Sequence, residues 1–208
     1  MAETSQDPAP LFRAAIQALA KGDPAAARLL PALDAFPDFA PGWLALASVL
    51  RDRGQSQAAA LTLLRAVRAA SATPAMLHQG GQAFAQLGQR DAAMSAFRRA
   101  VAQDPGFAPA WYSLGLALQD CAACAEAAAA FERAFALKPD FHEAAFNAGV
   151  AWQGAGEMAP AMDAYAASYR LRPDSFGRIA QALIAAPTGA LWLRPSALRA
   201  VLDSRAAA

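Results

Sequence analysis

Apolar residues recur along this chain with a helical spacing that repeats every 34 residues. Three prolines are separated by this interval: Pro105, Pro139 and Pro173. Numbering 34-residue segments so that each proline falls at position 32 gives segments that begin at Pro74, Ala108 and His142, and one more begins at Ala40. In each segment, positions 4, 7, 8 and 11 are mostly apolar, or glycine at position 8. This is the i, i+3, i+4, i+7 pattern of one helix face, so each segment is predicted to begin with an amphipathic helix.

A second helix is predicted in every segment after a turn. The turns fall at Gly54, Gly88, about Ala122, and Gly156. After each turn the chain has an alanine and then, four residues later, a large apolar residue: Ala59 and Leu63, Ala93 and Phe97, Ala127 and Phe131, Ala161 and Tyr165. Large residues are expected to fill the space between the two helices, while Gly or Ala at position 8 lets the backbones approach. Proline ends a segment because it cannot continue a helix interior.

This order of residues resembles the tetratricopeptide repeat family, whose unit has 34 residues. The resemblance implies an all-α fold, a right-handed α-solenoid of stacked antiparallel helix pairs with a C-terminal capping helix. The expected units are 40–73, 74–107, 108–141 and 142–175, preceded by a degenerate first unit at 6–39. Residues 176–208 are expected to form the capping helix and a C-terminal tail.

The two ends of the chain match the repeat less well. Residues 6–39 keep a second-helix pattern at Ala25, Leu29, Ala32 and Pro37, and a first helix could pack through Leu11, Phe12, Ile16 and Leu19. Near the other end, a helix over the last unit is suggested by Ile179, Ala182, Leu183 and Ala186. A turn at 187–189 and a short final helix over 195–204 should follow. The run 189–195, which includes Trp192, is either part of the cap or a docking element.

Composition limits the possible partners. The chain is 56% hydrophobic and 17% charged with a net charge of +1, which gives no electrostatic footprint for nucleic acid or for an anionic membrane. The first seven residues lack the basic-then-apolar order of a secretory signal, and no segment has about 20 uninterrupted apolar residues. We therefore expect a cytoplasmic protein with no membrane insertion.

Candidate chemistry is sparse. Cys121 and Cys124 form a CxxC pair in the turn of the 108–141 unit, where other units have glycine. A zinc site needs four ligands, and His78 and His142 have no metal-ligand spacing with the cysteines. A redox or metal-responsive role for the pair stays an alternative to small residues that simply fit a turn. No nucleophile elbow, HExxH motif or phosphate-binding glycine loop occurs, so we expect no enzyme activity, no cofactor and no metal.

The family resemblance also implies a binding surface. First helices of tetratricopeptide arrays line a concave groove with positions 2, 5, 6, 9, 12 and 13 of each unit, here called the groove positions. We expect a peptide-binding groove formed by Leu44, Ser48, His78, Gln82, Tyr112, Leu116, Gln119, Phe146, Asn147, Val150 and Gln153. Family members that clamp a carboxylate tail have Lys and Asn at positions 5 and 9. They also have Lys or Arg at positions 2 and 6 two units further on. This cationic clamp is missing here, so binding of a carboxylate tail is disfavoured.

The sequence therefore predicts a non-catalytic scaffold, an adaptor or assembly chaperone. Its neutral groove, with amide side chains and the large side chains of Tyr112, Leu116 and Phe146, suits an extended peptide or an amphipathic helix of a partner protein. Packing of the chain's own C-terminal segment on these residues is the competing expectation. An alternative function is a regulatory or targeting module of an enzyme complex, such as a methyltransferase or glycosyltransferase acting in trans.

Overall fold

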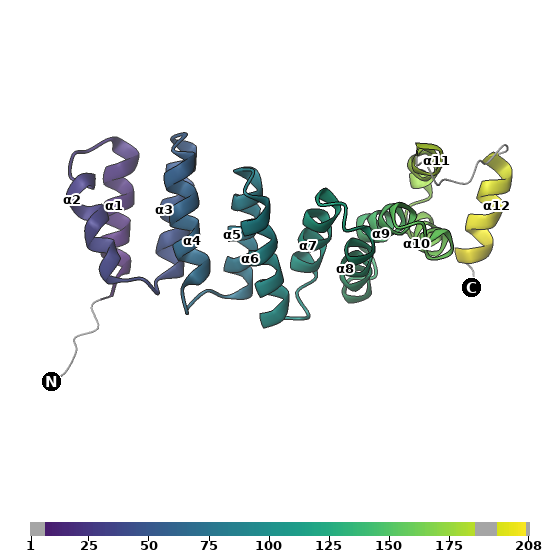
Figure 1. The fold of residues 1–208 in the computed structure, drawn as a ribbon, viewed down its shortest axis with the longest axis horizontal. Coiled ribbons are helices and arrows are strands. Elements are labelled where there is room, and N and C mark those ends of the chain that lie inside the picture. The colour runs from purple at the N-terminus through teal and green to yellow at the C-terminus, as the bar shows by residue number, and fades with distance from the viewer. Residues whose placement is uncertain (1–6, 186–194, 207–208) are drawn as a thin grey trace. The chain divides into compact units, whose positions relative to one another are not determined.

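The computed structural model describes residues 7–185 and 195–206, and throughout these ranges the regular structure is helical (Figure 1). The all-α fold of successive helix pairs confirms the predicted fold class. The chain divides into two compact units, 1–103 and 104–208, here called unit 1 and unit 2. The expected turn at 187–189 and the Trp192 segment lie outside the described residues.

Unit 1 contains three helix pairs. They are α1 (Ala9–Lys21) with α2 (Ala26–Ala32) and the 3-10 turn η1 (Leu33–Ala35), α3 (Ala40–Asp52) with α4 (Ser56–Arg68), and α5 (Pro74–Gln86) with α6 (Arg90–Gln103). Unit 2 contains α7 (Ala108–Asp120) with α8 (Cys124–Leu137) and α9 (His142–Gly154) with α10 (Met158–Leu171). It ends with the 3-10 turn η2 (Pro173–Ser175), α11 (Phe176–Ala185) and α12 (Pro195–Ala206).

Each helix pair is joined by the same left-handed turn. The residue at its centre has a positive φ: Gly22, Gly54, Gly88, Ala122 and Gly156. The next residue donates its N–H to a carbonyl near the end of the first helix, as from Gln55 to Leu50 at 2.9 Å and from Ala123 to Leu118 at 3.0 Å. This geometry satisfies carbonyls that the helix leaves free, and glycine adopts it without strain. The predicted turns therefore lie where the sequence placed them, with Ala122 in a conformation that favours glycine.

The two helices of a pair approach closely where position 8 is glycine. A Cβ atom at Gly81 would lie 2.5 Å from the Phe97 ring, and one at Gly149 would lie 2.5 Å from the Tyr165 ring. The same relationship holds between Gly115 and Phe131, at 2.7 Å. The aromatic rings of the second helices thus occupy the space that a position 8 side chain would need.

The first helix pair departs from the expected pattern. Ala25 and Ala32, which the sequence placed in the packing face of the second helix, are exposed, and Ala26 and Leu33 are buried in their place. The helix has only seven residues, contains Pro31 and continues as a 3-10 turn, so the packing face is displaced by one residue. The first helix packs as expected, with Phe12 against Phe39 and Trp43 at ring-centroid distances of 5.1 and 4.9 Å.

Two helices follow the last pair, where the sequence predicted a cap and a short final helix. α12 packs against α10, and its Leu198 and Leu202 are buried. α11 packs against the same core with Ile179 and Leu183. No helix within 7–185 or 195–206 is long and apolar enough to cross a membrane.

Candidate peptide-binding groove

The groove positions of α3 and α5 line one pocket in unit 1. Its volume is about 120 Å³, and it is lined by Leu44, Ala47, Ser48, Arg51, Leu63, Gln79, Gln82, Ala83 and Gln86. Leu44 and Leu63 are buried and form an apolar floor, whereas the three glutamines are exposed at the rim. Of the predicted unit 1 residues, Leu44, Ser48 and Gln82 therefore meet at this pocket.

A hydrogen bond connects the two helices across this pocket. Arg51 Nη1 donates to Gln86 Oε1 at 2.8 Å, and Arg51 Nη2 donates to Ser48 Oγ at 3.3 Å. Asp52 forms an ion pair with the same guanidinium at 3.3 Å. Because the arginine charge is paired with an adjacent carboxylate, the pocket presents hydrogen-bonding groups more than net charge.

His78, also predicted to face a partner, does not line the pocket. Its ring is half-buried and lies 5.7 Å from the Phe97 ring. Burial lowers the pKa of His78, because desolvation disfavours the charged imidazolium. This residue is therefore held against the second helix of its own pair.

In unit 2, the groove positions of α7 and α9 are joined by direct contacts. The Asn147 side-chain amide donates to the Tyr112 hydroxyl at 3.0 Å. The Tyr112 ring packs against Phe131 and Phe141 at 5.5 and 4.6 Å and is half-buried. Burial raises the pKa of Tyr112, and the Asn147 bond opposes that shift. Among the large apolar residues predicted for this face, Leu116 is the exposed one, with 40% of its surface accessible to solvent.

The structure corrects the expectation that Phe146 is an exposed anchor outside the core. Phe146 is 9% exposed and belongs to a buried cluster with Tyr165, Ile179 and Leu183. The Arg178 guanidinium lies over its ring, 4.3 Å from the centroid. α11 covers this part of the face. This agrees with the competing expectation that the chain's own C-terminal segment packs on these residues.

Gln153 is corrected in the same way. It is 2% exposed, accepts a hydrogen bond from the Tyr165 hydroxyl at 2.7 Å and donates to the Ala182 carbonyl of α11 at 3.3 Å. Val150 packs at the edge of the same cluster. Gln119, Asn147 and Val150 are half-buried, so among the residues predicted in unit 2 only Phe146 and Gln153 are inaccessible.

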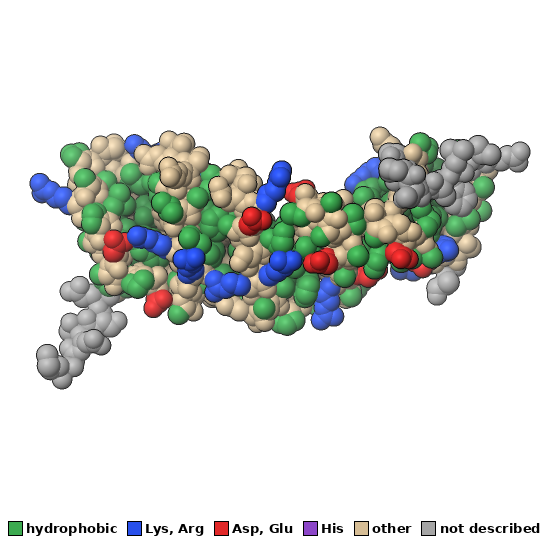
Figure 2. Space-filling view, viewed as in Figure 1, with side chains coloured by type: hydrophobic (Ala, Val, Ile, Leu, Met, Phe, Trp, Pro, Cys, Tyr) green, Lys and Arg blue, Asp and Glu red, His purple; other side chains and the backbone are tan. Residues whose placement is uncertain are grey.

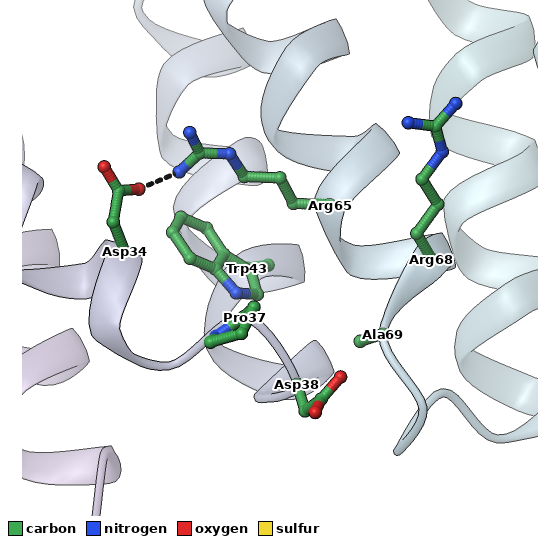
Figure 3. Close-up of a pocket in the computed structure, with 7 residues that line it drawn as sticks. All are labelled: Asp34, Pro37, Asp38, Trp43, Arg65, Arg68 and Ala69. Carbon is green, nitrogen blue, oxygen red and sulfur yellow. Dashed lines mark hydrogen bonds and ion pairs between the residues drawn. The ribbon is translucent and has the colours of Figure 1, made fainter.

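A second pocket in unit 1, of about 380 Å³, lies outside the groove positions (Figure 3). The Arg65 guanidinium lies 4.9 Å from the centre of the Trp43 ring and is ion-paired with Asp34. Asp38 Oδ1 accepts the Ala70 N–H at 3.2 Å. Sequence periodicity could not find this pocket, because Asp34, which lies in η1, has no acidic counterpart at the matching positions of the other segments. The charges of Asp34 and Arg65 are paired internally, which indicates a structural joint between two helix pairs.

The remaining chemistry is limited. Cys121 is exposed and Cys124 is half-buried, and both are free thiols. Within the described ranges, no group of three or more His, Cys, Asp or Glu side chains could hold a metal ion. On the face shown in Figure 2, side chains of both charges occur over each unit, so neither unit is covered there by charge of one sign.

Comparisons with known proteins identify the family of this chain. The fold is that of helix-pair solenoids that act as protein-interaction modules. Tetratricopeptide repeat models match residues 12–74, 74–117 and 124–176. The chain belongs to the tetratricopeptide repeat family, as its residue pattern predicted, and repeats of this family are generally non-catalytic. No curated protein sequence matches the chain.

Several solved structures share the fold. A MamA structure matches with a TM-score of 0.61 and 24% identity, covering 80% of this chain and 92% of MamA. A MamA fragment from Desulfovibrio magneticus RS-1 matches with a TM-score of 0.57 and 22% identity, covering 81% of this chain and 97% of the fragment. YrrB, a tetratricopeptide protein with an unusual peptide-binding site, matches with a TM-score of 0.61 and 20% identity, covering 83% and 90%. At these identities the likeness concerns the fold alone.

Proposed function

We propose that this chain is a non-catalytic adaptor or assembly chaperone that binds a segment of one partner protein through its groove positions. The unit 1 pocket supports this function most directly. Six groove positions from the first helices of two successive segments line a single hollow with an apolar floor and an amide rim. Such a pocket suits one apolar side chain of the partner.

The rim favours an extended segment in unit 1. Gln79 and Gln82 are exposed and each has both donor and acceptor groups. The backbone of a helix is largely satisfied within the helix, whereas an extended chain presents free N–H and C=O groups. Amide side chains beside an apolar pocket can therefore pair with the main chain of an extended peptide while its side chain fills the pocket.

The test uses the full chain and a partner identified by co-purification from the native host, then purified. We expect a Gln79→Ala/Gln82→Ala variant to bind this partner about 10-fold or more weakly, because two hydrogen bonds each contribute about 0.5–1.5 kcal/mol. Gln57→Ala is the matched control, since Gln57 is an exposed glutamine of α4 outside the pocket. Unchanged affinity of the double variant, with unchanged melting, would show that the partner binds elsewhere.

A further inference from the structure

α11 lies on the groove face of α9 as a short amphipathic helix. Ile179 and Leu183, four residues apart, are 0% and 1% exposed and join the cluster that contains Phe146. Ile184 is 65% exposed, so the helix buries one face and leaves an apolar residue on another. A helix of the chain itself therefore packs on the groove positions of α9.

Two polar contacts orient α11 on this face. Arg178, in its first turn, lies over the Phe146 ring, and the Ala182 carbonyl accepts from Gln153. Ala182 is among the last four residues of α11, and the carbonyls of these four residues accept no hydrogen bond within the helix. The face therefore interacts with a cation near the start of a helix and with a free carbonyl near its end.

The charge around this face complements the cation. Glu143, at groove position 2 of α9, is half-buried, and its carboxylate and the Arg178 guanidinium both act electrostatically on Tyr112. The Glu143 carboxylate itself contacts His142 Nε2 at 3.0 Å, at the start of α9. A basic residue on any helix seated here would gain from both Glu143 and the Phe146 ring.

α11 has little stability of its own. It has ten residues, and isolated helices shorter than about 12–15 residues are marginal in water. Gly177 lies in its first turn, which weakens a helix by roughly 0.5–1 kcal/mol relative to alanine. The Ser175 hydroxyl, directly before the helix, is buried without a hydrogen-bond partner and so does not cap it. Meanwhile α12 packs on α10, and its Leu198 and Leu202 belong to the same buried cluster as Ile179 and Leu183.

We propose that the groove face of α9 is a helix-binding site, and that α11 occupies it in place of a partner helix of the same chemistry. The partner helix has two apolar residues four apart, a basic residue directly before the first of them, and its carboxyl-terminal end at Gln153. This proposal rests on the proposed function and specifies the partner of unit 2. Binding then requires α11 to leave the face and exposes Phe146, Val150 and Gln153.

The experiment compares three full-length proteins with one defined probe. The probe is a fluorescent peptide with the sequence of residues 173–185, and the control peptide has serine in place of Ile179 and Leu183. The proteins are the wild type, an Ile179→Ser/Leu183→Ser variant whose α11 is released, and an Ile184→Ser variant as the matched control on the exposed side. We expect the released variant to bind the probe at least 10-fold more tightly than the other two, because a tethered α11 competes at up to millimolar effective concentration. The control peptide should bind none of them. Equal affinity for all three proteins, or no binding to a released variant that is still helical, overturns the proposal.

A second measurement needs no variant and covers the case in which the released protein unfolds. Hydrogen exchange of the wild type should show α11 amides exchanging at least 10-fold faster than those at the centres of α9 and α10. Equal protection would mean that α11 opens only with the whole unit, and the proposal fails. If the wild type is a dimer and the probe dissociates it, a second copy of the chain occupies the groove face of α9. That result would also overturn the proposal, because the partner helix would not come from another protein. Because Gln79 and Gln82 lie in unit 1, their test is independent of this result.

Discussion

The Tyr112 hydroxyl accepts a hydrogen bond from the Asn147 amide at 3.0 Å and so joins α7 to α9. Arg51 and Gln86 join α3 to α5 in unit 1 at 2.8 Å. Both bonds connect residues 35 positions apart, on first helices of successive pairs. Side chains at groove positions thus bond to each other, and under the proposed function a partner would exchange these contacts for its own.

A buried tyrosine, Tyr165, and a half-buried one, Tyr112, predict a loss of stability in alkaline solution. Burial raises the pKa of Tyr112 and, more strongly, that of Tyr165 above the usual value of 10.0. Below pH 10 both phenols are neutral in the folded and unfolded states, so their contribution is complete. As the pH rises above 10, the unfolded chain ionises first, and the free energy of unfolding should fall by up to about 1.4 kcal/mol per pH unit for each tyrosine.

Denaturant unfolding at a series of alkaline pH values checks this prediction. A Tyr165→Phe variant should be less stable at neutral pH, because Gln153 loses its donor, but its stability should decline less steeply above pH 10. An equally steep decline in the variant would mean that other groups cause the alkaline loss.

Truncation of Phe146 and of Leu116 should have different effects on stability, because the two side chains differ in exposure. Phe146→Ala should lower the free energy of unfolding by about 3 kcal/mol, because its ring is buried with Tyr165 and Ile179. Leu116→Ala should cost below about 1 kcal/mol, because 40% of its surface is already exposed. Thermal and urea unfolding of the two variants measure the difference. Equal losses would contradict the position of α11 over Phe146.

Ala122→Gly should stabilise the protein. Ala122 has a φ of 57°, a conformation that costs a residue with a Cβ atom about 1 kcal/mol, and glycine occupies this place in the other turns. We expect a gain of about 0.5–1 kcal/mol, seen as a rise of a few degrees in the melting temperature. Ala129→Gly, at an exposed position inside α8, is the control and should destabilise by about 1 kcal/mol. A loss at Ala122 similar to that at Ala129 would exclude the left-handed turn.

The cysteine pair should be dispensable for stability. Cys121 directly follows α7 and is exposed, while Cys124 begins α8 and packs beside Gly154. A Cys121→Ser/Cys124→Ser variant should change the free energy of unfolding by about 0.5 kcal/mol or less for each residue. Melting with and without reductant, together with metal analysis, checks this. Stoichiometric zinc, or a large loss of stability on reduction, would contradict it.

The parts of the fold that recur were predictable, and the parts that occur once were not. α3, α5, α7 and α9 begin at the residues where the 34-residue interval starts each segment, because four copies of one pattern define a common register. The first helix pair has a shortened second helix, and its register could not be taken from the other copies. Trp111, at the apolar position 4 of the segment that begins at Ala108, is only half-buried, and its Nε1 donates to the Pro105 carbonyl at 2.9 Å.

The residues at the candidate site were predictable in part, in unit 1 as in unit 2: His78 was expected at the unit 1 pocket and does not line it. Periodicity identifies which side chains leave the packing stripe, so Leu44, Ser48 and Gln82 were placed at one surface. It also identified Ile179 and Leu183 as one apolar face of a final helix. Where that helix lies depends on contacts such as Arg178 over Phe146 and Gln153 with Ala182, which join segments that have no repeated counterpart.

The glycine beneath each aromatic ring sets a rule for exchanging repeats. Gly81, Gly115 and Gly149 each leave space for a ring of the following helix, whereas Ala47 in the earlier pair faces the smaller Leu63, with which it lines one pocket. The chain therefore contains two solutions to one volume constraint, glycine with an aromatic ring and alanine with a leucine. A hybrid array that grafts the first helix of one pair onto the second helix of another should fold only when both members of such a couple are transplanted together.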